Sequence, residues 1–313
     1  MDLRQLNHFL AVAEELHFGR AAERLGMTQP PLSQSIMALE RELGAALFTR
    51  TKRNVALTPF GRQWLEHVRP AVGAVADLGA VAERLRQGTV GRLALSFVSS
   101  ADYSILPALV RRYSTAFPDV EMTLAEATSD VQIAALVEGR IDAGLLIPPA
   151  SGLPAAIDYR PLLREPLIAA VPEPWVKEGR LSIEGGRLAG ESWLDRPLLL
   201  FPRHVSPAFH DLVLDHYRAK GRSPDVRQRA IQMQTIISLV SAEMGMALVP
   251  ASLRNLARTG VCYLPLADAA PVLETGLAWR RADETPTLRT LVDIAVAMME
   301  KEIVIPTKAG MTI

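Results

Sequence analysis

The segment from Thr28 to Ser35 carries side chains whose chemistry suits the recognition of DNA bases. Glutamine can bind adenine through two hydrogen bonds, and serine can donate to or accept from a base edge. A threonine followed by two prolines suits an N-cap and the first turn of a helix. A solvated helix face has a similar composition, and the helix alone does not separate the two interpretations. The predicted base-contacting residues are Thr28, Gln29, Pro30, Pro31, Ser33, Gln34 and Ser35.

The next segment is basic, with no acidic residue from Leu43 to Leu65. Residues 50–57 alternate well enough for a β-hairpin with a basic tip. A basic tip beside a recognition helix suits phosphate contacts and insertion into the minor groove. We therefore add Arg50, Lys52 and Arg53 to the predicted DNA-binding residues. The alternative is a basic loop that increases solubility.

Three polar groups follow predicted strands in the C-terminal two thirds of the chain. Ligands of open α/β folds lie at strand carboxyl ends, against helix N-termini. Free amides, hydroxyls and the Arg203 guanidinium suit a carboxylate, although the acidic Asp102 leaves a partly cationic ligand open. The alternatives are N-capping for each Ser or Thr and a surface ion pair for Arg203. The predicted ligand-binding residues are Ser99, Ser100, Asp102, Thr128, Ser129, Pro202, Arg203 and His204.

No catalytic set accompanies these groups. The sequence has no GxSxG, no HExxH and no glycine-rich phosphate loop. Its six histidines lack paired ligand spacing, and Cys262 fits a small buried hydrophobe. We predict no enzyme activity, no metal and no cofactor besides a small-molecule ligand. Two alternatives stay open: a two-lobed enzyme with an accessory DNA-binding domain, and an architectural DNA-binding protein that senses nothing.

Short helices position the base-contacting residues. Apolar residues at helical spacing predict a first helix between Leu3 and Ala13. A second runs from about Phe18 to Leu25 and ends at Gly26, which readily takes a left-handed cap. A third continues to about Leu43. Two short helices joined by a tight glycine turn are typical of a helix-turn-helix.

A long helix is predicted from Thr58 and Pro59, an N-cap and first-turn pair, to about Gln87. Its apolar residues recur in steps of four and three, the a/d seam of a coiled coil. We predict a homodimer, whose two-fold symmetry implies pseudo-palindromic sites in double-stranded promoter DNA. The alternative is packing against its own C-terminal domain. The predicted dimerisation residues are Trp64, Val68, Ala71, Val75, Leu78, Ala82 and Leu85.

From Gly91 onward, predicted strands and helices alternate, which indicates a parallel sheet with helices on both faces. The first set consists of strands 92–98, 120–126 and 142–147 with helices 105–117 and 131–139. The second consists of strands 167–171, 198–201 and 247–250 with helices 207–220 and 235–243. Strand 276–280 and helix 288–301 complete the pattern.

Length and composition limit the protein class. A chain of 313 residues predicts two or three folded units. Its 34 basic and 34 acidic residues balance, so a DNA-binding surface must be local. A single cysteine excludes an intrachain disulfide and fits a reducing compartment. With no secretory signal and no run of about 18 apolar residues, we expect a cytoplasmic protein without a membrane partner.

The N-terminal strings LRQLNHFLAVAEELHFGRAAERLGMTQPPLSQSIMALERELGAALFTRTKR and LTPFG resemble the DNA-binding domain of LysR-type transcriptional regulators. The resemblance implies that residues 29–35 lie in the major groove and that Arg53 reaches the minor groove. Many relatives carry arginine where Gln34 stands, so a different base preference is expected. The resemblance also implies linker-helix dimers that pair into homotetramers, and RNA polymerase as a partner if the protein activates transcription.

The strings FPDVEMTLAE, LVEGRIDAGLL, SLVSAEMGMALVPASL and FPRH resemble the effector domain of the same family. That domain resembles periplasmic binding proteins, with two α/β lobes joined by crossovers, here near Leu163 and Leu266. The resemblance implies that Ser100 and Ser129 contact an effector, and the string FVSS is most similar to regulators of aromatic-compound catabolism.

The expected protein is a DNA-binding transcriptional regulator controlled by a small effector bound between two lobes. The effector is expected to be anionic and, in one interpretation, aromatic. The expected organisation has five parts. They are a winged helix-turn-helix at 1–58, a linker helix at 59–88, lobe I at 89–163 and 267–302, lobe II at 164–266, and a tail at 303–313.

Overall fold

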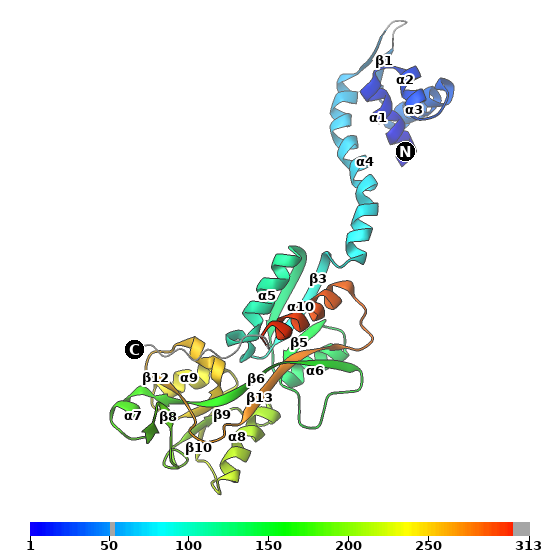
Figure 1. The fold of residues 1–313 in the computed structure, drawn as a ribbon. Helices are drawn as coiled ribbons and strands as arrows, with labels where there is room; N and C mark the ends of the chain where they lie inside the picture. The colour runs from blue at the N-terminus through cyan, green and yellow to red at the C-terminus, as the bar shows by residue number, and fades with distance from the viewer. Residues whose placement is uncertain (51–53, 303–313) are drawn as a thin grey trace. The chain divides into compact units, whose positions relative to one another are not determined.

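The computed structural model describes residues 1–50 and 54–302, with side chains to residue 299 (Figure 1). The chain divides into two compact units, Met1–Arg84 and Leu85–Ile313. Lys52, Arg53 and the predicted tail at 303–313 lie outside the described residues. Among the described helices, none is long and apolar enough to cross a membrane.

The N-terminal unit is a helix-turn-helix followed by a two-stranded hairpin, as the sequence predicts. Asp2 and Gln5 cap the first helix through a reciprocal capping box. Gly26 and Gly44 follow the second and third helices with φ angles of +66° and +68°, a left-handed conformation that glycine adopts at little cost. The elements are α1 (Leu3–Glu15), α2 (Phe18–Arg24), α3 (Gln29–Leu43), β1 (Phe48–Arg50), β2 (Val55–Leu57) and the first part of α4 (Pro59–Arg86).

An apolar core fixes the orientation of α3. Leu32, Ile36 and Leu39 form one stripe of this helix and have no exposed surface. They pack in the same cluster as Phe9 of α1, whose ring lies 5.5 Å from that of Phe48 and 4.8 Å from that of Trp64. Burial of each such side chain contributes about 1.5–3 kcal/mol. The opposite stripe of α3 is therefore held toward solvent.

Helix α4 begins against the hairpin through two small residues. Thr58 Oγ1 accepts a hydrogen bond from the Gly61 amide at 2.8 Å and donates one to the carbonyl oxygen of Ala46 at 2.7 Å. Gly61 is buried, and a Cβ atom at this position would lie 2.2 Å from the carbonyl oxygen of Leu47. The close approach of α4 to the chain before the hairpin therefore requires glycine here.

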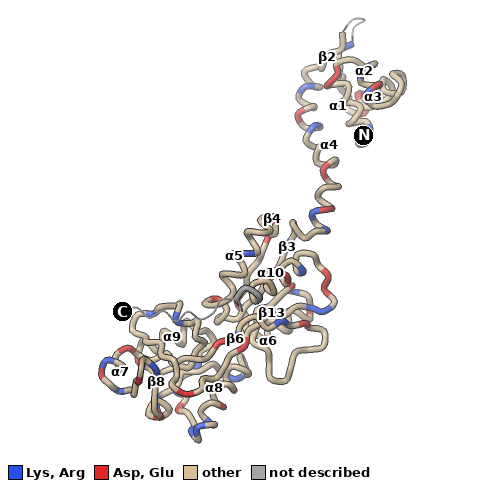
Figure 2. Tube along the Cα trace, in the orientation of Figure 1, with Lys and Arg blue, Asp and Glu red and all other residues tan. Residues whose placement is uncertain are grey.

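The predicted seam of α4 is buried near the start of the helix and exposed farther along it. Val68 is 4% exposed and packs in the core of its own unit, with Trp64 partly buried against the same core. Intramolecular packing thus covers Val68, and its predicted place in the dimer seam is corrected, whereas Trp64 keeps some exposed surface. The rest of the seam is exposed, on a helix that otherwise carries residues of both charges (Figure 2). It consists of Ala71, Val75, Leu78, Ala82 and Leu85.

The C-terminal unit is built on a seven-stranded sheet with the order β11-β6-β13-β5-β3-β4, in which β12 also pairs with β6. Strand β3 runs parallel to β4 and β5, whereas β13 is antiparallel to β5 and β6. The sheet is therefore mixed, and the prediction of a wholly parallel sheet is corrected. The bounds are β3 (Val90–Phe97), β4 (Asp119–Glu126), β5 (Ala143–Leu146), β6 (Ile157–Pro172), β11 (Ala247–Pro250), β12 (Val261–Pro265) and β13 (Val272–Arg280).

Strand β6 joins the two lobes without a break. Its first part, from Ile157 to Pro166, pairs with β13, and its last part, from Leu167, pairs with β11 and β12. Figure 1 shows β6 and β13 side by side along this path. The chain therefore passes the predicted first crossover, near Leu163, as a hydrogen-bonded strand, and returns between β12 and β13.

Helices cover both parts of this sheet. Near the first part lie α5 (Ile105–Ala116), α6 (Ser129–Val137) and the returning α10 (Pro286–Glu302), where the Tyr113 hydroxyl of α5 donates to the carbonyl oxygen of Thr287 at 3.0 Å. The second part adds a parallel pair, β9 (Leu198–Leu200) and β10 (Val226–Arg229). Its other elements are α7 (Glu173–Lys177), α8 (Pro207–Ala219), α9 (Met233–Ser241) and the hairpin of β7 (Ile183–Glu184) and β8 (Arg187–Leu188).

Two glycines of α4 test the packing of the N-terminal unit. Gly61→Ala forces a Cβ atom against the Leu47 carbonyl and should lower the free energy of unfolding by about 1–3 kcal/mol or more. Gly73 lies on the same helix, and a Cβ atom added there would have no described atom within 4 Å, so Gly73→Ala should raise that free energy by about 0.5–1 kcal/mol. Urea unfolding measures both. Equal effects would contradict the close contact at Gly61.

Candidate functional site

Helix α3 presents part of the predicted base-contacting set to solvent. Gln29, Pro30, Pro31 and Gln34 are exposed, and Ser33 is half-buried beside them. Thr28 is the N-cap residue, but its side chain makes no capping hydrogen bond, which corrects the prediction of a hydroxyl cap. The exposed stripe is the face opposite Leu32, Ile36 and Leu39.

Ser35 belongs to a different face of α3. Its hydroxyl lies 2.8 Å from His8 Nδ1, and His8 is 6% exposed in α1. Burial, and then the positive charge of Arg4, lowers the pKa of His8 below its usual value. The structure therefore uses Ser35 to tie α3 to α1. Sequence spacing missed this bond because His8 lies 27 positions away.

Arg50 links the hairpin to α3. Its Nη2 lies 3.0 Å from Glu40 Oε2, its Nη1 donates to Ser33 Oγ at 3.3 Å, and its guanidinium lies 4.7 Å from the centre of the Phe18 ring. Glu40 also accepts hydrogen bonds from the amides of Leu47 and Phe48. Arg50, predicted to contact phosphate, therefore holds the hairpin and Ser33 in register.

A pocket lies between the two lobes of the C-terminal unit and has a volume of about 160 Å³. One wall comes from the ends of β3, β4 and β5 and the start of α6, and the other from the segments before α8 and α9. Cavities of roughly 150 Å³ hold a benzene-sized molecule. Its walls consist of Val98, Ser99, Ser100, Glu126, Ala127, Thr128, Ser129 and Ile147, and of Phe201, Val205, Ser206, Phe209, Ile231, Gln232 and Met233.

The hydroxyls in this pocket differ in their partners. Ser99 Oγ accepts from the Met233 amide of the opposite lobe at 3.5 Å, and Ser129 Oγ accepts from the Ile147 amide at 3.1 Å. Thr128 donates to Asp130 instead of capping α6. Ser100 is 4% exposed, and its hydroxyl has no hydrogen-bond partner among the described residues. An unpaired buried hydroxyl costs free energy, so this group is available to a ligand.

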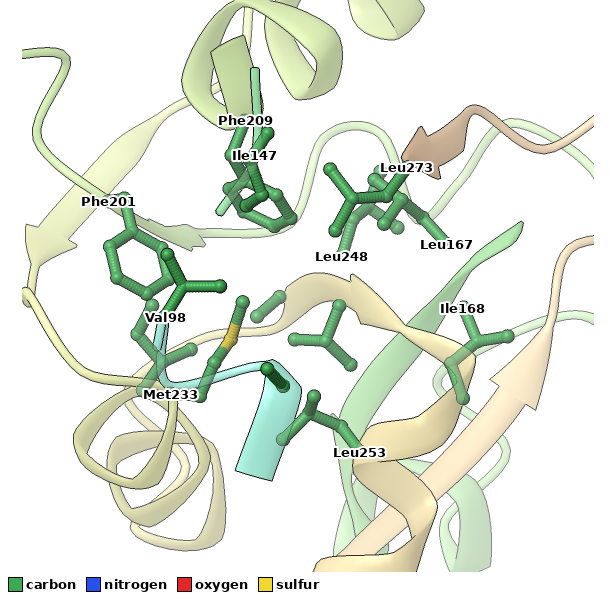
Figure 3. Close-up of a cluster of buried hydrophobic side chains, with 14 of the residues drawn as sticks. Val98, Ile147, Leu167, Ile168, Phe201, Phe209, Met233, Leu248, Leu253 and Leu273 are labelled. Atoms are coloured by element: carbon green, nitrogen blue, oxygen red, sulfur yellow. The ribbon is translucent and has the colours of Figure 1, made fainter. Parts of the chain in front are cut away.

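The remaining walls are largely apolar. Figure 3 shows Phe201 beside Val98 and Met233, with Ile147 and Phe209 close by. These five side chains belong to the apolar core that runs through both lobes. The rings of Phe201 and Phe209 meet edge-on at 5.5 Å. The pocket thus combines an apolar surface with a few polar groups, as ligand sites do.

Four predicted ligand-binding residues do not line this pocket. Asp102 and His204 are exposed, and Pro202 is half-buried. Arg203 Nε and Nη2 each lie 2.9 Å from a carboxylate oxygen of Asp211 in α8, and this pair lowers the pKa of Asp211 to about 2. The prediction that Arg203 supplies the charged contact in the pocket is corrected. The surface ion pair that the sequence left open is what the structure contains.

Pocket residues of both walls were not predicted from the sequence. Gln232 and Met233 form the start of α9, two positions before the predicted start at Thr235. Glu126, the last residue of β4, was placed within the strand and not in a site. The rule that ligands meet strand ends and helix starts applies to both segments. The start of α9 was predicted two positions too late, whereas the end of β4 at Glu126 was predicted correctly but was not included in the site.

Comparisons with known proteins match both units. Residues 3–62 match the family described as bacterial regulatory helix-turn-helix protein, lysR family, and residues 86–300 match the LysR substrate binding domain. The chain is 60% identical over 293 residues to the HTH-type transcriptional regulator IlvR of Caulobacter vibrioides, covering 93% of this chain and 96% of that protein. The chain belongs to the LysR family of transcriptional regulators.

Other members agree with this assignment. The HTH-type transcriptional regulator AlsR of Bacillus subtilis is 36% identical over 297 residues, covering 94% of this chain and 95% of that protein. The crystal structure of full-length CbnR with its target DNA superposes with a TM-score of 0.77 at 26% identity, covering 95% of this chain and 99% of that one.

This LysR-family protein is a DNA-binding transcriptional regulator with a ligand-controlled effector domain, and not an enzyme. The resemblance found in the sequence is therefore confirmed, together with the helix-turn-helix and the two-lobed fold. The alternatives of a two-lobed enzyme and of an architectural protein without a sensing domain are excluded.

The buried His8 makes the stability of the regulator's N-terminal unit depend on pH. A lowered pKa means that the unfolded chain binds more protons, so this stabilisation is complete above about pH 6.5 and decreases as the pH falls below it. His8→Gln should flatten the decrease in melting temperature between about pH 7.5 and 5.5. Exposed His67→Gln is the control and should keep the wild-type profile. Identical profiles for His8→Gln and the wild type would contradict the assignment.

Proposed function

We propose that this regulator senses a small carboxylate-bearing molecule in the pocket between its lobes, with Ser99, Ser100, Thr128 and Ser129 as polar contacts. The observation that carries the proposal is the unpaired Ser100 hydroxyl, buried in a pocket that both lobes build. A hydroxyl that lacks a partner costs about 1–3 kcal/mol, and a ligand that bonds to it recovers that cost.

Helix starts support a carboxylate. The first turns of α6 and α9 both begin in the pocket walls, and neither helix is capped by the side chain of its own N-cap residue. Ser99 of the opposite lobe accepts from the first amide of α9. Free amides and the helix dipole at such ends favour negative charge. The phenylalanine side chains in the second wall suit apolar ligands, aromatic acids included.

A ligand that touches both walls can act as a switch. Phe201 and Met233 come from one lobe, and Ser100 and Ser129 from the other. Binding then favours the arrangement of the lobes in which both walls are in contact, and a regulator responds only if its two states differ in ligand affinity. If the protein is an activator, RNA polymerase is its partner. The arrangement of the lobes that engages RNA polymerase then decides whether the ligand turns transcription on or off.

The DNA-facing part of the proposal rests on the exposed face of α3. Gln29, Pro30, Pro31, Ser33 and Gln34 would lie in the major groove, with Arg50 positioning Ser33 through its bond to the hydroxyl. Arg53 and Lys52 remain proposed contacts with the minor groove and phosphates. Promoter DNA of a bacterial regulator lies in the cytoplasm, where we place the protein's action.

The exposed seam of α4 supports a homodimer, and pairs of dimers would give a homotetramer. Val75 is 43% exposed, Leu78 60% and Leu85 49%, an unusual run of large apolar groups for a helix that faces only water. Pairing of two such seams buries them and gives the protein two-fold symmetry. Two-fold symmetry in turn favours pseudo-palindromic DNA sites.

A charged residue introduced into the α4 seam tests whether the seam forms the dimer interface. Val75→Glu would place two unpaired carboxylates in the proposed interface, and we expect the full-length protein to dissociate to monomers. Ala80→Glu adds the same charge to an exposed position off the seam and should leave the oligomer intact. Sedimentation equilibrium measures both masses. An unchanged mass for Val75→Glu would show that this seam is not the interface.

The Ser100 hydroxyl tests the sensing site. Ser100→Ala removes an unpaired buried group, so the free energy of unfolding without ligand should stay constant or rise. The melting temperature of the full-length wild type is first screened against aliphatic, aromatic and amino-substituted carboxylic acids. An acid present at about 100 times its dissociation constant stabilises the folded state by about 2.7 kcal/mol. Ser100→Ala should lose most of that gain.

Ser104→Ala is the matched control. Its hydroxyl bonds to the carbonyl oxygens of Ser100 and Ala101, and it lies one turn beyond the pocket walls. This variant should lose a little stability and keep the response to the acid. If Ser100→Ala and the wild type respond equally, the sensing site lies elsewhere.

A further inference from the structure

The charge of the pocket is unlike that of a site for a simple organic anion. Among its described wall residues, Glu126 is the one charged side chain, and none is Lys, Arg or His. Arg203, two positions after the wall residue Phe201, is engaged by Asp211 and does not line the pocket. A purely anionic ligand would therefore meet a carboxylate and no cationic side chain.

Glu126 is poised to bind a cation. It is exposed at the pocket wall, and no ion pair or hydrogen bond to its carboxylate is found within residues 1–50 and 54–299. The protein atoms around it, and then the negative charge of Asp102, raise the pKa of Glu126. Both effects disfavour an unpaired carboxylate, and a positive group placed beside it would relieve them.

The groups that favour a negative charge begin close to Glu126 in the chain. Ser129 begins α6 three positions later, and the nine-residue helix has no side-chain cap. The nine-residue α9 begins at the same pocket from the other lobe; its N-cap residue Gln232 makes no capping bond, and its first amide, that of Met233, donates to Ser99 Oγ at 3.5 Å. The buried, unpaired Ser100 hydroxyl is a second and independent sign that a polar ligand group belongs at this end. These groups favour a carboxylate.

The rest of the pocket suits a short apolar chain. Val98, Ile147, Phe201 and Phe209 are buried, with between 2% and 8% of each residue exposed. A volume of about 160 Å³ leaves room for a compact group of a few carbon atoms beside the two polar poles. A sugar or a polyol would leave hydroxyls unpaired against these walls.

We propose that the effector is an α-amino acid with an apolar side chain, held through its ammonium group by Glu126 and through its carboxylate by Ser100 and the starts of α6 and α9. In such a molecule the two charges lie close together, and Glu126, Ser100 and the starts of both helices line one small pocket. The inference rests on the proposed sensing site and narrows its ligand class.

Titration calorimetry on the full-length protein tests this with three matched pairs. The probes are L-valine, L-leucine and L-phenylalanine, each compared with the same skeleton lacking the amino group: 3-methylbutanoate, 4-methylpentanoate and 3-phenylpropanoate. At least one amino acid should bind ten or more times tighter than its counterpart, because the counterpart leaves Glu126 unpaired. The matching amine without a carboxylate should also bind at least tenfold more weakly.

Variants assign the preference to Glu126. Glu126→Gln should weaken binding of the amino acid at least tenfold and leave the affinity for the deaminated acid equal or higher. Glu121→Gln makes the same change on the same strand, at an exposed residue paired with Arg92, and should bind like the wild type.

Two results would overturn the inference. In the first, a deaminated acid binds the wild type as tightly as its amino acid and loses affinity in Ser100→Ala; the sensing site then stands and the ligand class is wrong. In the second, none of the amino acids binds; the class is again wrong, and the acid screen with Ser100→Ala decides the site separately.

Discussion

The ladder between β6 and β13 is the constraint on which the C-terminal unit depends. Both strands are hydrogen-bonded to each other through the first lobe, and β6 continues into the second lobe as the partner of β11 and β12. This continuous pairing links the two lobes through one hydrogen-bonded strand. The pocket draws its walls from both of the lobes that this strand links, so a ligand that contacts both walls would favour one arrangement of the lobes.

The disposition of charge explains how one chain of zero net charge performs two recognition tasks. In the N-terminal unit, Arg50 is committed to Glu40 and Ser33, so the exposed face of α3 offers uncharged groups such as Gln34. In the effector domain, Arg203 is committed to Asp211, and the pocket keeps Glu126 and the starts of two helices. Arg50 and Arg203 are thus held in ion pairs within the protein, and neither is free to supply a charged contact from the α3 face or from the pocket walls.

The sequence predicted the elements whose signals are local. Apolar spacing and glycine caps located α1 to α4, and the strand ends located the pocket residues Ser99, Ser100, Thr128 and Ser129. It could not predict partners that folding brings together. His8 turns Ser35 away from the base-contacting face, and Phe9 covers Trp64, across separations that spacing rules do not measure. Arg203 was assigned to a ligand because Asp211, although only eight positions away, lies on a helix whose facing residues depend on tertiary packing.

We propose that a small molecule bound between the lobes controls this LysR-family regulator. A crystal structure of the full-length protein, grown with an acid that raises its melting temperature, tests the claim most directly. We expect electron density for the acid within hydrogen-bond distance of Ser100 Oγ and against the first turns of α6 and α9. Density elsewhere, such as the cavity beside Glu165 and Ser252, with the Ser100 pocket unoccupied, would contradict it.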